Sequence, residues 1–400
     1  MSRLAAPSPA APRRMLPLAA LLLLSVSLTP LGGCGWFGGP SEADQVASAV
    51  DPFHEPQPGT ATGLNRAWKS NVASEPSHRM EHPGVIAVDK GDVYVASHQG
   101  AVTRIDRQTG SRAWNVEIGR GIEGGVAVDG ELVFAGTTDG QLVALKKEDG
   151  SVAWRAPLTT VATSAPAAAA GRVIVVSLDN RAHCFDARTG KRLWSHAATP
   201  EALVLMGAGA PTVVGSAVLV GYSTGEVFAL ALEDGRRLWS DNLTTLSASR
   251  SELDMLQDVD ARIVVDGKRA YAVNHQGRLT AFNVNGGRIW ERPLSALRTP
   301  LILGDRIIAA DTEGNLQAVS AADGTPLWKV RLTSGLLAAP VEWNGKIVAA
   351  DDEGRLYTVS PRDGKVVGLD KIKETVFADP IVADKALYLW TNEGNLHRYD

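Results

Sequence analysis

The chain has 400 residues, a formal net charge of −4 at pH 7 and 44% hydrophobic residues. This weakly acidic balance is unlike that of a nucleic-acid-binding domain, so nucleic acid is not expected as a partner. Two cysteines are too few for a disulfide framework or for a zinc site built on cysteine ligands.

The first 33 residues are predicted to be a lipoprotein signal peptide. Three arginines and no acidic residue accompany an apolar run over residues 15–28, which is too short to span a bilayer comfortably. The motif Leu31-Gly32-Gly33-Cys34 follows at the edge of that run and resembles the bacterial lipobox. By this resemblance, Cys34 is the lipidated first residue of the mature chain, and Gly35 after it favours the outer membrane. The alternative is an ordinary signal peptide that happens to carry a cysteine.

Residues 34–63 are rich in Gly, Pro, Ser and Ala, which predicts a flexible tether between the lipid and the folded domain. Several acyl chains, at about 0.8 kcal/mol per buried CH₂, would give stable membrane anchoring. Residues 64–400 are then predicted to form one domain. With Cys34 lipidated, Cys184 is the only remaining thiol, and its small apolar slot in the repeat predicts a buried core residue.

From residue 64 onward the chain repeats one pattern: a strand, a tight turn and a second strand that ends in tryptophan. The unit is clearest from Gly140 to Trp154, with Asp149-Gly150 as the turn. Its opening glycine recurs at a mean spacing of 42 residues, and an asparagine takes the slot once, as expected where φ must be positive. The eight openings are Gly100, Gly140, Asn180, Gly225, Gly277, Gly314, Gly354 and Gly394.

The closing tryptophan indicates how the repeats are arranged. It recurs in six repeats, Gly368 holds the seventh slot, and a spare tryptophan, Trp68, precedes the first repeat. A repeat of about 40 residues with four short strands has the size of a propeller blade. The sequence therefore predicts an all-β fold, an eight-bladed β-propeller with four antiparallel strands per blade, closed by the N-terminal strand around Trp68. The alternative is another all-β repeat, such as an array of sandwiches.

Two apparent catalytic motifs are explained by the repeat itself. Residues 119–124 match G-x-G-x-x-G, but a strand rather than a helix is predicted to follow. Residues 221–225 match G-x-S-x-G, but this serine falls in a turn between two strands. The eight histidines show no metal-ligand spacing. We therefore expect no catalytic residue, no cofactor and no metal, and interpret His183, His275 and His397 as surface or packing residues.

The repeat, Ala-hydrophobic-x₄-Gly-x₃-Trp, as in Ala144 through Gly150 to Trp154, resembles that of the pyrroloquinoline quinone propellers. In that family the tryptophan docks one blade against the next. The resemblance leaves a pyrroloquinoline-quinone-dependent periplasmic dehydrogenase as the alternative function. Such enzymes need a calcium site and a stacking platform, and many carry an adjacent cysteine pair, which this chain lacks.

The lipobox, the tether and the ring together resemble the BamB family, lipoprotein subunits of the machinery that inserts β-barrels into the bacterial outer membrane. The resemblance is sharpest in residues 253–260, Leu-Asp-Met-Leu-Gln-Asp-Val-Asp. It implies a non-enzymatic scaffold, lipid-anchored in the outer membrane and facing the periplasm. The implied partners are the periplasmic domains of BamA and the rest of the β-barrel assembly complex, with unfolded outer-membrane proteins as a further candidate.

Two neighbouring repeats carry extra loops. The intervals of 45 and 52 residues between openings are the longest, and they hold residues 197–210 and 241–260. Both loops follow a tryptophan strand, so we expect one continuous surface patch, which by the resemblance binds BamA. Core packing of the leucines and turn capping by the aspartates are the alternatives. The candidate partner-binding residues are Leu203, Leu205, Asp258, Asp260 and Met206, which stands where the family pattern has an arginine.

Overall fold

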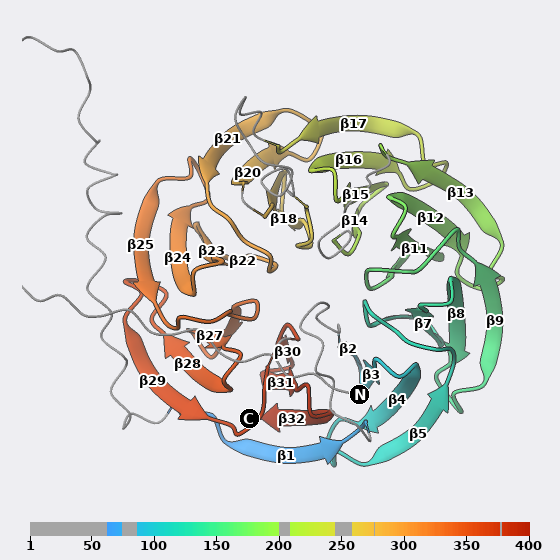
Figure 1. Ribbon diagram of the computed structural model, residues 1–400, viewed down its shortest axis with the longest axis horizontal. Coiled ribbons are helices and arrows are strands. Elements are labelled where there is room, and N and C mark those ends of the chain that lie inside the picture. The colour runs from blue at the N-terminus through green and yellow to red at the C-terminus, as the bar shows by residue number, and fades with distance from the viewer. Residues whose placement is uncertain (1–61, 74–85, 200–208, 245–257, 276, 377) are drawn as a thin grey trace, which may run out of the picture. The chain divides into compact units, whose positions relative to one another are not determined.

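Eight four-stranded antiparallel sheets are arranged as a closed ring in this computed structural model (Figure 1). The structure describes residues 62–73, 86–199, 209–244, 258–275, 277–376 and 378–400. All of them belong to one compact unit. Within these ranges, no helix is long and apolar enough to cross a membrane.

Blades 1 to 4 follow the chain, each from its innermost to its outermost strand. Blade 1 comprises β2 (Ala87–Asp89), β3 (Asp92–Ala96), β4 (Ala101–Asp106) and β5 (Arg112–Glu117). Blade 2 comprises β6 (Val126–Asp129), β7 (Leu132–Gly136), β8 (Gln141–Lys146) and β9 (Val152–Pro157). Blade 3 comprises β10 (Ala167–Ala169), β11 (Arg172–Ser177), β12 (Arg181–Asp186) and β13 (Arg192–Ala197). Blade 4 comprises β14 (Thr212–Val214), β15 (Ala217–Gly221), β16 (Glu226–Ala231) and β17 (Arg237–Asn242).

Blades 5 to 8 repeat this plan, and blade 8 takes its outermost strand from the start of the domain. Blade 5 comprises β18 (Val264–Asp266), β19 (Arg269–Val273), β20 (Arg278–Asn283) and β21 (Arg288–Pro293). Blade 6 comprises β22 (Leu301–Leu303), β23 (Arg306–Ala310), β24 (Asn315–Ser320) and β25 (Pro326–Arg331). Blade 7 comprises β26 (Val341–Trp343), β27 (Lys346–Ala350), β28 (Arg355–Val359) and β29 (Val366–Lys371). Blade 8 comprises β30 (Ile381–Ala383), β31 (Ala386–Trp390), β32 (Asn395–Tyr399) and β1 (Arg66–Asn71).

The N-terminal strand closes the ring, as the spare tryptophan predicts. Strand β1 pairs antiparallel with β32, and Trp68 lies opposite Arg398 in that register. The backbone N–H of Asp400 also donates to the carbonyl of Asn65 at 3.0 Å. The predicted fold of eight blades with four antiparallel strands each is therefore confirmed.

The hydrophobic core lies between neighbouring blades rather than inside any single blade. One cluster of buried side chains joins Ile174 and Val176 of blade 3 to Val218 and Val220 of blade 4, and each of the other junctions has a similar cluster. A blade alone would leave these faces in water, so stability depends on stacking neighbours around the ring.

The turn that opens each repeat has the backbone geometry that the sequence predicts. Asn180 adopts φ 52°, in the left-handed region, and Gly140 in the same slot of blade 2 adopts φ 76°. The Asn180 amide also serves the next blade, because its Oδ1 accepts a hydrogen bond from the Ser223 hydroxyl at 2.9 Å. Asparagine therefore adopts the glycine conformation here and also forms a hydrogen bond to the next blade that glycine could not form.

The closing tryptophans join one blade to the next, as the resemblance to the quinone propellers implies. The Trp154 Nε1–H donates to the carbonyl of Ala187 in blade 3 at 2.9 Å. A Cβ added at Gly190 would lie 2.6 Å from Cδ2 of the same indole, so the ring packs directly on glycine backbone. Seven indole N–H groups donate in this way, Trp68 to Arg107, Trp114 to Lys147, Trp154 to Ala187, Trp194 to Leu232, Trp239 to Val284, Trp290 to Ala321 and Trp328 to Pro361.

The junction between blades 7 and 8 is built differently. Gly368 lies opposite Thr358 in blade 7, the position that Trp328 takes opposite Ala318 in blade 6. In its place Trp343, on the innermost strand β26, donates its indole N–H to the carbonyl of Lys385 at 2.7 Å. Among the described residues, this is the one hydrogen bond between blades that an indole donates from an inner rather than an outer strand.

Candidate functional site

Four of the predicted site residues lie outside the described residues. They are Cys34, Leu203, Leu205 and Met206. Lipidation and partner binding by these residues stay predictions, as do the signal peptide over residues 1–33 and the tether over residues 34–63.

The ends of the two extra loops meet on the ring. The loops follow β13 and β17, the outermost strands of neighbouring blades 3 and 4. Where they return, the backbone N–H of Gly209 donates to the carbonyl of Val259 at 2.9 Å. The two segments therefore re-enter the ring side by side, which is the placement that a shared patch requires.

Asp258 and Asp260 are placed differently from the exposed loop expected of them. Asp258 is only 1% exposed, and both carboxylate oxygens of Asp260 are buried. The physical reason is Val259 between them, whose side chain belongs to the core between blades 4 and 5 and holds this stretch against Gly221. Their alternation turns both carboxyls away from that core, and Asp260 faces the interior of the ring.

These two carboxyls share an electrostatic environment with Arg298. Burial raises the pKa of the Asp260 carboxyl well above its ordinary value, the neighbouring Asp258 charge raises it further, and Arg298 opposes both effects. Arg298 itself is only 5% exposed. Burial likewise raises the pKa of Asp379, which also lies near Arg298 and accepts a hydrogen bond from the Ala339 N–H at 3.1 Å.

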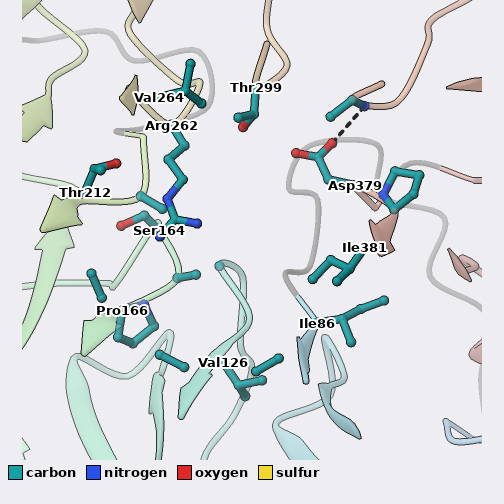
Figure 2. A pocket seen from close by; sticks show the side chains of 18 of the residues that line it. Ile86, Val126, Ser164, Pro166, Thr212, Arg262, Val264, Thr299, Asp379 and Ile381 are labelled. Carbon is teal, nitrogen blue, oxygen red and sulfur yellow. Dashed lines mark hydrogen bonds between the residues drawn. The ribbon is translucent and has the colours of Figure 1, made fainter. Parts of the chain in front are cut away.

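A cavity of about 830 Å³ lies where the innermost strands converge (Figure 2). All eight blades contribute to its wall, and 23 of its 33 lining residues are Ala, Val, Ile, Leu or Pro. Its volume is in the range of small-ligand pockets. The wall is thus mostly apolar, with a few polar groups placed among small side chains.

The polar groups of the cavity gather mainly on the side of blades 3 to 5. Arg262 extends its guanidinium toward Ser164 in Figure 2, and Thr212 lies nearby. The Thr212 hydroxyl donates to the carbonyl of Ile263 at 2.6 Å and so fixes the backbone next to Arg262. Sequence reasoning missed Arg262 and Ser164. The one available signal was the alternation of Arg262 with Asp258 and Asp260 in the segment before β18, where the intervening Val259 and Ala261 are buried in the core.

The remaining motif residues have structural roles. Residues 119–124 lead into strand β6, not into a helix, and Ser223 of the G-x-S-x-G match is buried against Asn180. His183 and His397 are fully buried, consistent with packing. Cys184 is also buried, and burial raises the pKa of its thiol to about 12. In the part of the chain that the structure describes, no group of three or more His, Cys, Asp or Glu could hold a metal ion.

Comparison with known proteins matches most of the ring to one family. The family model described as outer membrane protein assembly factor BamB matches residues 98–330 and 312–400. The BamB of Escherichia coli K12 is 30% identical over 337 residues, covering 81% of this chain and 83% of that protein. The BamB of Yersinia pestis is 28% identical over 339 residues, covering 81% and 84%.

Solved structures show the same architecture. BamB from Moraxella catarrhalis has a TM-score of 0.75 at 23% identity, covering 84% of this chain and 99% of that one. A quinohemoprotein alcohol dehydrogenase from Comamonas testosteroni has a TM-score of 0.65 at 14% identity, covering 84% and 76%. At these identities the likeness concerns the fold alone.

Proposed function

The chain belongs to the family of the outer membrane protein assembly factor BamB, and we propose that it is a lipid-anchored scaffold that binds the periplasmic region of BamA. Family membership gives it a role in outer membrane protein assembly and an association with the outer membrane. The family match over residues 98–400 carries this conclusion. The anchor, the periplasmic orientation and the BamA contact are the proposed part.

A scaffold needs a stiff body that presents a defined surface. Seven outer-strand indole bonds between blades supply the stiffness. The ends of the two extra loops supply a common base, because Gly209 and Val259 are hydrogen bonded. We place the partner surface on these loops, with Leu203, Leu205 and Met206 as its apolar centre, since a few central apolar residues usually dominate an interface.

Asp258 and Asp260 enter this proposal in a changed role. As buried residues they would act by holding the end of the second loop rather than by touching BamA. The backbone supports this placement, because the carbonyl of Asp258 accepts a hydrogen bond from the His275 N–H at 3.1 Å and Val259 N–H donates to the Tyr222 carbonyl at 3.2 Å. Replacing both aspartates with Ala should therefore alter partner binding through the loop. The melting temperature of the domain should change in the same variant.

The surface is tested with Leu205→Asp. A charge without a counter-ion at the centre of an apolar interface is costly, so binding to purified BamA periplasmic domains should fall by at least about tenfold, about 1.4 kcal/mol. Leu327→Asp is the matched control, since Leu327 is 39% exposed on the outermost strand of blade 6. Normal binding by a folded Leu205→Asp variant would place the interface elsewhere. If the variant unfolds, core packing of this leucine is the correct interpretation.

The anchor is tested with Cys34→Ser. The variant should be soluble or remain an unprocessed precursor, because it lacks the acceptor thiol for the lipid. Cys184→Ser is the control. The Cys184 thiol is buried in blade 3, so its substitution should leave membrane association unchanged. The lipid anchor would be ruled out if the Cys34→Ser variant, without binding to BamA, still fractionated with salt-washed outer membranes.

A further inference from the structure

We propose that the central cavity binds the carboxylate end of a short apolar peptide, with Arg262 as the partner of the carboxylate. This inference goes beyond the scaffold function and does not depend on the BamA contact. It rests on a cation and two hydroxyls that have no partner among the described residues, and on an apolar wall lined by strand edges.

Arg262 is the cation of this site. It makes no ion pair or hydrogen bond with any residue that the structure describes. Its side chain is reached by solvent inside the cavity, while the enclosing protein lowers the pKa of its guanidinium through burial alone. A guanidinium in such a place is suited to a carboxylate, which it can bind through two parallel hydrogen bonds.

The four acidic residues of the cavity wall do not neutralise Arg262. Asp89 pairs with Lys147, and Glu123 lies 3.7 Å from His98 Nδ1. The cation that acts on Asp260 and on Asp379 is Arg298. Burial raises the pKa of both carboxyls, which favours their neutral forms. No described residue therefore compensates the positive charge of Arg262 on the side of the cavity formed by blades 3 to 5.

Two buried hydroxyls of the cavity wall supply further donors, and that of Ser164 lies on the side toward which Arg262 extends. Thr163 and Ser164 are 7% and 6% exposed, and neither hydroxyl has a hydrogen-bond partner among the described residues. Their backbone is fixed by blade 2, because a Cβ added at Gly124 would lie 2.0 Å from the carbonyl carbon of Ser164. A buried hydroxyl without a hydrogen-bond partner is unfavourable, and a ligand oxygen that accepts its hydrogen bond would remove that penalty.

The wall favours a peptide over an acyl chain. Among the described strands, each innermost strand pairs on one side only, so its other edge faces the cavity with backbone N–H and C=O groups. An extended peptide can use such edges, as in strand addition, whereas an acyl chain would leave them unpaired. The small residues Ala167, Ala168 and Ala169 on β10 leave room for apolar side chains of the ligand.

The test uses the full chain and a fluorescent hexapeptide of Ala, Val and Leu in two forms, one with a free C-terminal carboxylate and one amidated. Affinity is measured by fluorescence anisotropy. The free form should bind at least tenfold more tightly than the amide. Arg262→Gln should lower the affinity for the free form to that for the amide and leave the amide unchanged, while Arg262→Lys retains part of the preference. Arg236→Gln is the matched control on an exposed outer turn of blade 4.

Each outcome decides the proposal. Equal affinity for the two peptides, no binding by either, or an Arg262→Gln variant that keeps the preference would overturn it. Tighter, Arg262-dependent binding of laurate would also overturn it, because the ligand would then be a fatty acid. If Arg262→Gln does not fold, the comparison of the two peptides on the parent chain decides alone. The Leu205→Asp variant should keep the full preference, so failure of the BamA proposal remains distinct.

Discussion

Single glycines under the tryptophans determine how closely the blades approach. Gly190 adopts φ 71° and contacts the Trp154 indole, whereas Gly171 adopts the same φ of 71° with no atom within 4 Å of an added Cβ. Both positions penalise alanine through their backbone. The first position adds overpacking against the indole, so the two glycines separate backbone strain from docking.

Gly190→Ala should therefore lower the free energy of unfolding more than Gly171→Ala does. The expected difference is about 1–3 kcal/mol, the usual cost of overpacking. Chemical denaturation of the two variants measures it. Equal destabilisation would mean that the indole moves aside without cost and that the junction is looser than the structure indicates.

Buried His183 gives the protein a pH-dependent stability. The His183 imidazole is fully buried, and its Nε2 lies 3.1 Å from Ser177 Oγ and 3.2 Å from Thr159 Oγ1. Burial lowers the pKa of His183 to about 4, so the folded state holds it neutral. Below its ordinary pKa of 6.5 the unfolded state binds the proton more readily, and stability falls as the pH falls toward 4.

In His183→Gln this contribution is absent. Between pH 6.5 and 4 the variant should lose less unfolding free energy than the parent, by roughly 2–3 kcal/mol over the full range. Above pH 7 the two stability profiles should run parallel, which is the internal control. Parallel profiles throughout would show that His183 titrates alike in both states.

At the residue scale, prediction from sequence succeeded where the backbone conformation restricts which residue types a position can hold. Asn180 was placed in a glycine slot because positive φ restricts the choice, and the structure gives it φ 52°. Asp258 was expected in a loop, but its burial depends on Val259 entering a core made by other blades. Arg262 was missed for a similar reason, because only the closed ring brings Ser164 of blade 3 toward it.

Strands were the easiest elements to predict, because eight copies repeat one pattern. Even blade 7, where Gly368 holds the tryptophan slot, has its fourth strand, β29, Val366–Lys371. The closing strand was inferred from a tryptophan count rather than from local pattern. No sequence window around β1 shows that its partner is β32, since their pairing joins opposite ends of the domain.

Loss of the closing strand should destabilise the ring strongly. Deletion of residues 64–72 removes Trp68 with its hydrogen bond to the Arg107 carbonyl and exposes the edge of β32. Removal of a large aromatic residue from its packing site costs about 3 kcal/mol or more. Thermal melting of the deletion variant should show a clearly lower transition than the parent.

A deletion of equal length from the predicted tether, residues 42–50, is the control and should melt like the parent. A shortened ring that melts at the parent temperature would show that β1 contributes little to stability, although it pairs with β32.

Considered as a whole, the ring has one junction unlike the others. Between blades 7 and 8 the outer-strand indole is replaced by Gly368, and Trp343 binds from the inner side instead. Local opening takes place where packing is weakest. Native-state hydrogen exchange should therefore show an opening free energy for β29 that is lower than for β25 by about 1–2 kcal/mol, the net contribution of a lost hydrogen bond and its packing.

Trp343→Phe sharpens this test. It removes the indole N–H that donates to Lys385 and should increase exchange at this junction while leaving β13 and β17 unchanged. Uniform exchange around the ring, before and after the substitution, would mean that the eight junctions open as one cooperative unit.

The pairing of β1 with β32 also sets an order of events in time. Arg66 and Tyr399 are register partners, although they stand near the two ends of the domain. A chain made from its N-terminus therefore produces β1 first and gives it a partner last. Contacts so distant in sequence form slowly, and until then both strands present unpaired edges that invite aggregation. We therefore expect closure of the ring to be the final step of folding, and the step during which the unfinished chain most needs protection from aggregation.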